Sequence, residues 1–168
     1  MSYVIPRSLS GIFCDDIRQE IRGKRTLVGC YTGTMEVSDF PVVLPKLCIV
    51  AIVQGSTDKP FRNIKLVVLK DDEQLLEGQL PVPDAPNASA NAMQRFDVQF
   101  VLSPFNVDAP CTLRVRAHVD DEEIRGLALT ICKVSESRLA EDDATQAPDS
   151  QGKRKRGKGD RGKGDGGN

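Results

Sequence analysis

The sequence contains no tryptophan and a single histidine, and aromatic residues make up only 5% of its 168 positions. One histidine limits the catalytic arrangements that the chain can build, because a serine or cysteine nucleophile usually needs a histidine base within reach. No Gly-x-Ser-x-Gly motif occurs either. His118 lies on the outward face of a predicted strand, so we interpret it as a surface residue. We predict no catalytic residues and a protein that is not an enzyme.

Long apolar runs are also absent, and no segment approaches the roughly 18 residues that a membrane-spanning helix needs. The first residues lack the basic region and apolar stretch that mark a secretory signal peptide. We therefore expect a cytoplasmic protein that makes no contact with a membrane. The sequence leaves open whether it becomes part of a virion.

The five cysteines are odd in number, and none forms a Cys-x-x-Cys pair. Each lies in or beside an apolar run, which favours free, buried thiols over disulfides. Their spacing also lacks the short pairs of ligands that zinc sites use, so no metal or cofactor is predicted. The cysteines are Cys14, Cys30, Cys48, Cys111 and Cys132.

The net charge of −1 conceals an acidic body and a basic C-terminal segment. Seven Lys or Arg and three Asp lie in Asp149–Asn168, whereas the rest of the chain carries 16 basic and 21 acidic residues. Residues 136–168 have few apolar side chains, so they cannot offset the entropy of becoming ordered. We therefore expect a folded domain over residues 1–135 and a disordered tail, acidic and then basic, over residues 136–168.

The basic residues of the tail are separated by glycines and have no aromatic neighbours. Such a segment can contact phosphate backbones without reading bases, and any contact is weak and sensitive to salt. The competing interpretation is a tail that only aids solubility. The candidates for contact with nucleic acid or another polyanion are Lys153, Arg154, Lys155, Arg156, Lys158, Arg161 and Lys163.

Alternation of apolar and polar residues is the clearest local pattern, and it is typical of strands with one face on a core. It is most regular in Gln94–Leu102 and Cys111–Val119. We predict that truncating Phe100 to alanine costs about 3–5 kcal/mol. The residues predicted to be substantially buried in these two strands are Phe96, Phe100, Leu113 and Val115.

About eight strands, with turn residues between them, predict an all-β fold: a two-layer antiparallel β-sandwich followed by the disordered tail. We expect two hairpins, one formed by the fourth and fifth strands and one by the last two. Asp15–Arg22 is the only candidate for a helical turn, and Pro81–Asn91 is expected to be a long exposed loop. The predicted strands are Leu9–Cys14, Arg25–Tyr31, Leu47–Gln54, Asn63–Lys70, Gln74–Leu80, Gln94–Leu102, Cys111–Val119 and Ile124–Lys133.

Three acidic clusters occupy predicted turns or strand ends: Asp15–Asp16, Asp71–Glu73 and Asp120–Glu123. If consecutive strands simply alternate in direction, the first cluster lies near the third, and the second lies at the opposite end. Carboxylates that converge from two loops could bind calcium. The simpler interpretation is solvated turns.

Several short segments form a recognisable set: Phe13-Cys14-Asp15-Asp16-Ile17-Arg18, Gly23-Lys24, Thr26-Leu27-Val28-Gly29, Tyr31, Pro41, Leu44-Pro45-Lys46-Leu47 and Val68-Leu69-Lys70-Asp71-Asp72. In these segments the chain resembles an uncharacterised family of short bacterial and tailed-phage proteins. The resemblance covers roughly residues 9–80 and implies a compact β domain in a bacterial or prophage setting, with no activity or catalytic residues attached.

The sequence therefore favours a non-enzymatic interaction module of a bacterial or phage-infected cell that binds an unknown protein partner through the sandwich surface. Two alternatives stay open. One is a polyanion-binding accessory protein that acts through the basic tail, and the other is a calcium-dependent β-sandwich module.

Overall fold

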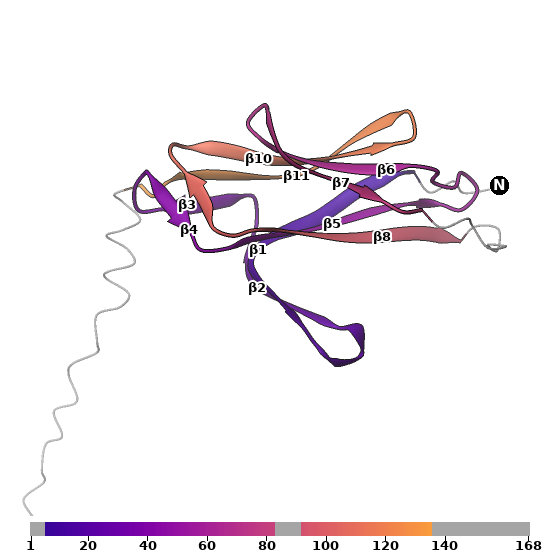
Figure 1. Ribbon diagram of the computed structural model, residues 1–168, viewed down its shortest axis with the longest axis horizontal. Helices are drawn as coiled ribbons and strands as arrows, with labels where there is room; N and C mark the ends of the chain where they lie inside the picture. The colour runs from indigo at the N-terminus through magenta and orange to yellow at the C-terminus, as the bar shows by residue number, and fades with distance from the viewer. Residues whose placement is uncertain (1–5, 83–91, 136–168) are drawn as a thin grey trace, which may run out of the picture. The chain divides into compact units, whose positions relative to one another are not determined.

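Eleven strands and one short 3₁₀ turn make up the part of the chain that the computed structural model describes, residues 6–82 and 92–135 (Figure 1). The predicted all-β class is therefore confirmed. The elements are β1 (Ser8–Gln19), η1 (Ile21–Gly23), β2 (Arg25–Tyr31), β3 (Thr34–Val37), β4 (Val42–Leu44), β5 (Leu47–Ser56), β6 (Ile64–Lys70), β7 (Glu73–Leu80), β8 (Met93–Leu102), β9 (Phe105–Val107), β10 (Cys111–Val119) and β11 (Glu122–Lys133).

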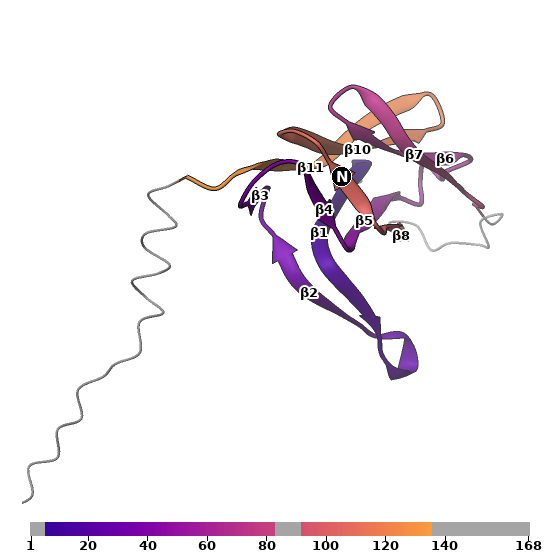
Figure 2. The same cartoon turned by 60° about the vertical axis from the view of Figure 1, so that its left-hand side comes forward.

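Two sheets form the layers of the sandwich, and both views show them stacked (Figures 1 and 2). One has four strands in the order β2-β1-β5-β8, and the other has five in the order β3-β11-β10-β6-β7. Strands β4 and β9 form a separate two-stranded sheet. The layers meet closely at Gly126 on β11, where a Cβ atom would collide with the side chain of Leu9 on β1. Glycine at this position therefore leaves room for the side chain of Leu9.

All eight predicted strands are present, and the two predicted hairpins are β6–β7 and β10–β11. Three further strands, β3, β4 and β9, contain only three or four residues each. They were missed because they lie among glycines and prolines and are too short to show an alternating pattern. The pairing of β3 with β11 is parallel, so the five-stranded sheet is mixed rather than wholly antiparallel.

The expected helical turn over Asp15–Arg22 is wrong for most of its length. Strand β1 continues to Gln19 and pairs with β2 as far as Gln19 and Arg25, so Asp15–Gln19 is extended. Only Ile21–Gly23 forms a 3₁₀ turn, and Arg22 and Gly23 have positive φ values of 63° and 71°. Pairing across a hairpin therefore overrides the weak local preference for a helix.

Strand β5 is buried on both faces, unlike the alternating strands around it. Its inward side chains include Leu47, Ile49 and Val53, which belong to the central core. On the outward face, Cys48 is fully buried and Val50 is only 5% exposed. Another element of the protein must therefore cover the outward side chains of β5 on the outer surface of the four-stranded sheet.

The predicted burial is confirmed for β10 but only in part for β8. Leu113 and Val115 are buried, whereas Phe96 and Phe100 are half-buried although they face the core as predicted. The reason is position in the sheet. Strand β8 is an edge strand, so its inward side chains have neighbours on one side only. The ring of Phe100 lies against Gly78 on β7, the edge strand of the other layer.

The prediction of five buried thiols is correct for three of them. Cys14, Cys48 and Cys111 are buried, Cys132 is half-buried and Cys30 is exposed, and all five are free. Cys30 is exposed because β2 lies at the edge of its sheet. Burial raises the pKa of Cys14 to about 11, so this thiol stays protonated at neutral pH.

These burial differences set the expected cost of core truncations. Leu113→Ala should lower the free energy of unfolding by about 2–5 kcal/mol, because it leaves a closed cavity. Phe100→Ala should cost only about 1–2 kcal/mol, because water already reaches part of the ring. Urea unfolding of both variants measures the difference. Equal losses of unfolding free energy in the two variants would show that Phe100, on the edge strand β8, is as well shielded from water as Leu113.

Candidate interaction surface

The β1–β2 hairpin forms an arm that projects from the sandwich, and we define the arm as residues 15–28 (Figure 2). Strand β1 pairs with β5 only from Ser8 to Cys14. Beyond Cys14 it pairs with β2 alone, so the hairpin leaves the sheet there. At this bend the hydroxyl of Tyr31 donates a hydrogen bond to Asp15, and Lys46 pairs with Asp16.

Two polar contacts tie the arm to the outer face of β8. Arg25 donates to Asp97 at 2.7 Å, and the side-chain amide of Gln19 donates to Gln99 at 3.2 Å. Asp97 also accepts from Arg95 at 2.9 Å. Burial opposes ionisation of Asp97, but the hydrogen bonds from Arg95 and Arg25 outweigh it and lower the pKa of this carboxyl. The carboxylate therefore stays charged at neutral pH and holds the arm near the sheet.

A groove of about 600 Å³ lies between the arm and the sheet. Its floor contains Ile12, Val50 and Ile52 from the central strands, and Leu27 contributes from the arm. Arg25 and Arg95 lie at its rim, where they share the carboxylate of Asp97. Ile12, Ile52 and Leu27 are half-buried, so the arm covers the outer face of β5 incompletely. The full lining is Ser10, Gly11, Ile12, Gly23, Arg25, Leu27, Val50, Ile52 and Arg95.

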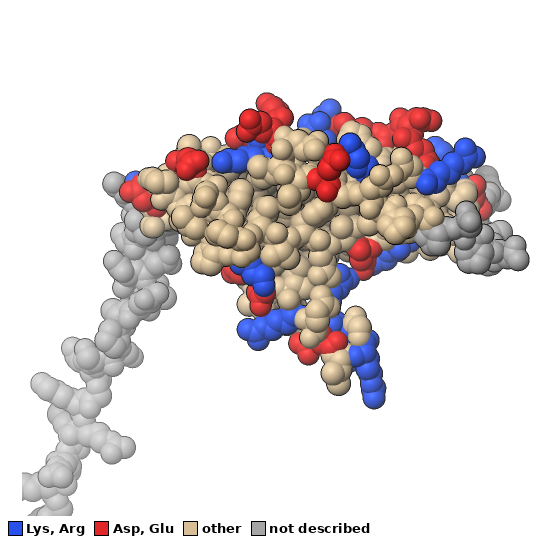
Figure 3. Space-filling model, in the orientation of Figure 1, with Lys and Arg blue, Asp and Glu red and all other residues tan. Residues whose placement is uncertain are grey.

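The arm carries four Lys or Arg and three Asp or Glu, and positive charge gathers at its tip. Figure 3 shows Lys and Arg side chains on both sides of the projection at the bottom of the view. Arg22 and Lys24 at the tip are exposed, and neither side chain has an ion-pair partner among the described residues. Ile21, next to them, is 82% exposed. The tip therefore presents unpaired cations beside an apolar side chain.

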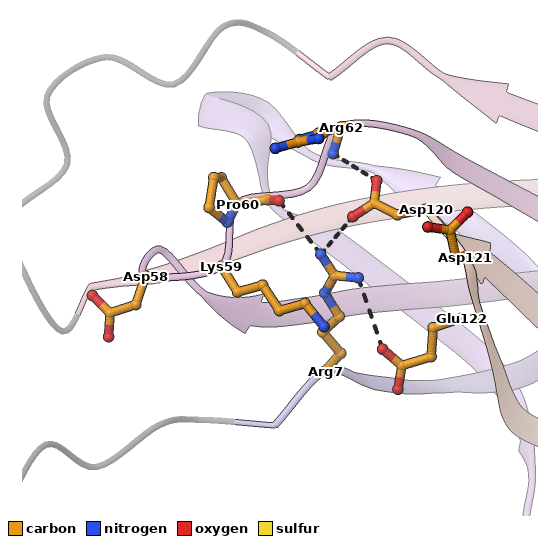
Figure 4. Close-up of a pocket in the computed structure, with 8 residues that line it drawn as sticks. All are labelled: Arg7, Asp58, Lys59, Pro60, Arg62, Asp120, Asp121 and Glu122. Atoms are coloured by element: carbon orange, nitrogen blue, oxygen red, sulfur yellow. Dashed lines mark hydrogen bonds and ion pairs between the residues drawn. The ribbon is translucent and has the colours of Figure 1, made fainter.

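A second hollow lies at the other end of β1 and is lined almost entirely by charged residues (Figure 4). Arg7 donates to Asp120 at 2.6 Å, and its guanidinium lies 3.8 Å from Glu122 and 5.1 Å from the centre of the Phe61 ring. The side chain of Arg7 is only 5% exposed. We call this set of contacts the Arg7 clamp.

The Arg7 clamp connects the two layers of the sandwich. Asp120, at the β10–β11 turn, has a positive φ of 54° and accepts hydrogen bonds from the backbone amides of Arg62 and Asn63. Burial opposes its ionisation, but these amides and Arg7 outweigh that effect and lower its pKa. Because Arg7 and Asp120, the most buried charges here, already pair with each other, we interpret this hollow as structural.

The structure separates the acidic clusters in a different way from the one predicted. Asp120 pairs with Arg7, which directly precedes β1. Asp15 lies eight residues after Arg7, which corresponds to about 25 Å of extended strand. The expected closeness of Asp15–Asp16 to Asp120–Glu123 is therefore wrong. Simple alternation failed because β2 and β5, the second and third predicted strands, both pair antiparallel with β1 and therefore run in the same direction.

Asp71 does lie at the opposite end from Asp120, as predicted: the two residues flank the two ends of β6 and β10. Within residues 6–82 and 92–135, no three His, Cys, Asp or Glu side chains gather where they could hold a metal ion. His118 is half-exposed on the outward face of β10, and its strand neighbours are Glu123 and Lys65.

The predicted polyanion contacts at residues 153–163 lie outside the described residues, as does most of the predicted 81–91 loop. Their roles stay predictions. Among the described residues, no helix is long and apolar enough to span a membrane.

Residues 9–132 match the model of DUF6941, a family of unknown function. The chain belongs to this family. The match to DUF6941 contains the whole arm and every residue that lines the groove, whereas Arg7 precedes it. No curated protein matches the chain in sequence.

The groove was not predicted from the sequence, although one signal pointed to it. Leu47-Cys48-Ile49-Val50-Ala51-Ile52-Val53 is an uninterrupted apolar run, which is typical of a strand covered on both faces. An antiparallel sandwich with one solvated face would show alternation here instead. The run therefore indicated that another element covers the outer face of β5.

The Arg7 clamp predicts a measurable pH dependence. Asp120→Asn keeps an oxygen that can accept from the two amides, and asparagine tolerates positive φ. At neutral pH the variant should lose about 2–4 kcal/mol of unfolding free energy, because a buried guanidinium loses its nearest carboxylate. The folded pKa of Asp120 is lowered, so its stabilisation is present above about pH 4 and is lost as the pH falls through the folded pKa.

Urea unfolding of the wild type and Asp120→Asn at neutral pH and near pH 3 tests this expectation. The gap in stability between the two proteins should narrow at the lower pH. A gap that stays constant would show that the charge of Asp120 does not stabilise the fold.

Proposed function

We propose that this chain is a binding module that acts without catalysis and holds an extended segment of a partner protein in the groove beneath the β1–β2 arm. The observation that carries the proposal is the apolar floor formed by Ile12, Val50 and Ile52, in which Ile12 and Ile52 are only half-buried. Apolar side chains left accessible in a groove with a charged rim favour association with another apolar surface.

The position of the groove beside a sheet favours an extended polypeptide. Gly23, Arg25 and Leu27 line it from the arm, and Ile12, Val50 and Ile52 line it from the outer face of the four-stranded sheet. A strand-like segment sends alternate side chains to opposite faces. One row of apolar side chains from the partner would then rest on Ile12 and Ile52 while the other row faces solvent.

The charges around the groove favour an acidic partner. Arg25 and Arg95 share a single carboxylate, so the rim has one positive charge in excess. Arg22 and Lys24 at the arm tip add two more, and the neighbouring Glu20 removes one. Aspartate or glutamate residues in the partner would meet these cations, with an effect on affinity that salt weakens.

The setting of this function is also part of the proposal. The family resemblance supports a bacterial or phage-infected cell, and five free cysteines fit a reducing cytoplasm. A small DUF6941 domain that recognises a peptide segment would serve there as an accessory or adaptor protein.

A library of random peptides of about twelve residues, displayed on phage, tests the proposal directly. The full-length protein should enrich peptides that combine apolar side chains with aspartate or glutamate. The double variant Ile12→Thr/Ile52→Thr should bind the enriched peptides at least tenfold more weakly, because threonine suits a strand but removes apolar contact area. Val43→Thr is the matched control, since Val43 is 60% exposed on β4 and lies outside the groove.

Two double variants test how much the positive charges of the arm tip contribute to peptide affinity. Arg22→Gln/Lys24→Gln should weaken peptide binding at low salt and have little effect at high salt. Lys59→Gln/Arg62→Gln removes the same charge from the other hollow and should leave affinity unchanged. Enriched peptides that bind all these proteins equally would contradict the proposed groove.

A further inference from the structure

The four edge strands of the two large sheets differ in how they are protected from pairing with another chain. Natural sheets protect their edges by short strands, bulges and irregular pairing. Strand β3 has four residues, β7 has an irregular register opposite Val68 and Leu69, and β2 has Gly29 at a positive φ of 65°. Strand β8 has ten residues, all paired with β5 without a register shift. Among residues 6–82 and 92–135 it is therefore the most regular unpaired edge of the sandwich.

The side chains of β8 are also incompletely covered. Its inward row, which includes Phe96, Val98 and Phe100, is half-buried, whereas the residues opposite them on β5 are buried. On the outward row, Val101 is 52% exposed. A further strand placed beside β8 would cover apolar surface on both faces of the sheet at once.

We propose that β8 pairs antiparallel with β8 of a second copy of this chain and joins the two four-stranded sheets into one sheet of eight strands. This inference goes beyond the proposed function, because the β8 edge is separate from the apolar floor of the groove. A second copy is the favoured occupant because a two-fold interface requires a surface that is complementary to itself.

The sequence of β8 meets that requirement in a register centred on Val98. Each Phe96 then lies opposite Phe100 of the second copy, a type of aromatic pair that stabilises antiparallel strands. Arg95 lies opposite Val101, and Asp97 lies opposite Gln99, so no like charges face each other. The ladder would span Gln94–Leu102, nine residues of the free edge. A register centred one residue earlier would instead place Asp97 opposite Asp97.

Charge substitutions at Val101 test both the interface and its register. Val101→Lys places a lysine opposite Arg95 of the second copy at two symmetric positions and should weaken dimerisation about fivefold. Val101→Glu places an opposite charge there and should not weaken it. Because Val101 is half-exposed on an outer face, both variants should fold, and circular dichroism melting curves check this. Val43→Lys and Val43→Glu are the matched controls on another exposed strand.

Sedimentation velocity of the full-length proteins, from low to high micromolar concentration, gives the dissociation constants. The proposal expects a wild-type dimer at high concentration, a weaker dimer for Val101→Lys only, and no change in the controls. A wild-type protein that stays monomeric throughout would overturn it. A dimer that responds equally to lysine and glutamate at position 101 would also overturn it, because the Arg95 contact would then be absent.

Discussion

Strand β5 must be covered on both of its faces, and much of the architecture follows from this constraint. Its inward side chains enter the core between the layers, and its outward side chains Cys48 and Val50 are nearly as well buried. Full burial of an aliphatic side chain contributes about 1.5–3 kcal/mol, so leaving this outer face in water would be costly for a small domain. The chain covers it in part by turning the end of β1 and the first part of β2 out of the sheet as the arm, residues 15–28.

Strand β1 is fixed at both ends, and this positions the arm. At its start, the Arg7 clamp ties it to the β10–β11 turn of the opposite layer through Asp120. At its far end, Arg25 and Gln19 tie the arm to β8. The covering is incomplete between these anchors, and Ile12 and Ile52 remain accessible. The groove is therefore a consequence of how the sheet protects its central strand.

The sequence predicted the strands well because the alternation of apolar and polar residues is a local signal, contained within each strand's own residues. Cys111–Val119 alternates without a break, and its predicted faces agree with the structure. The edge position of β8 depends on sheet order, which no local pattern contains, so the burial of Phe96 and Phe100 was overestimated. The arm was missed for a related reason: Asp15–Gln19 has no apolar alternation, and only its partner strand makes it extended. The groove is thus a product of topology rather than of a motif.

The central claim is that a partner segment rests on the floor of the groove, and methyl NMR of the full-length protein tests it most directly. On titration with an acidic, apolar peptide enriched from the displayed library, the methyl signals of Ile12, Leu27, Val50 and Ile52 should shift together with one dissociation constant. Those of Val43 on β4 and Val107 in the core should stay in place. Shifts confined to residues outside the groove, with these four signals unchanged, would contradict the account.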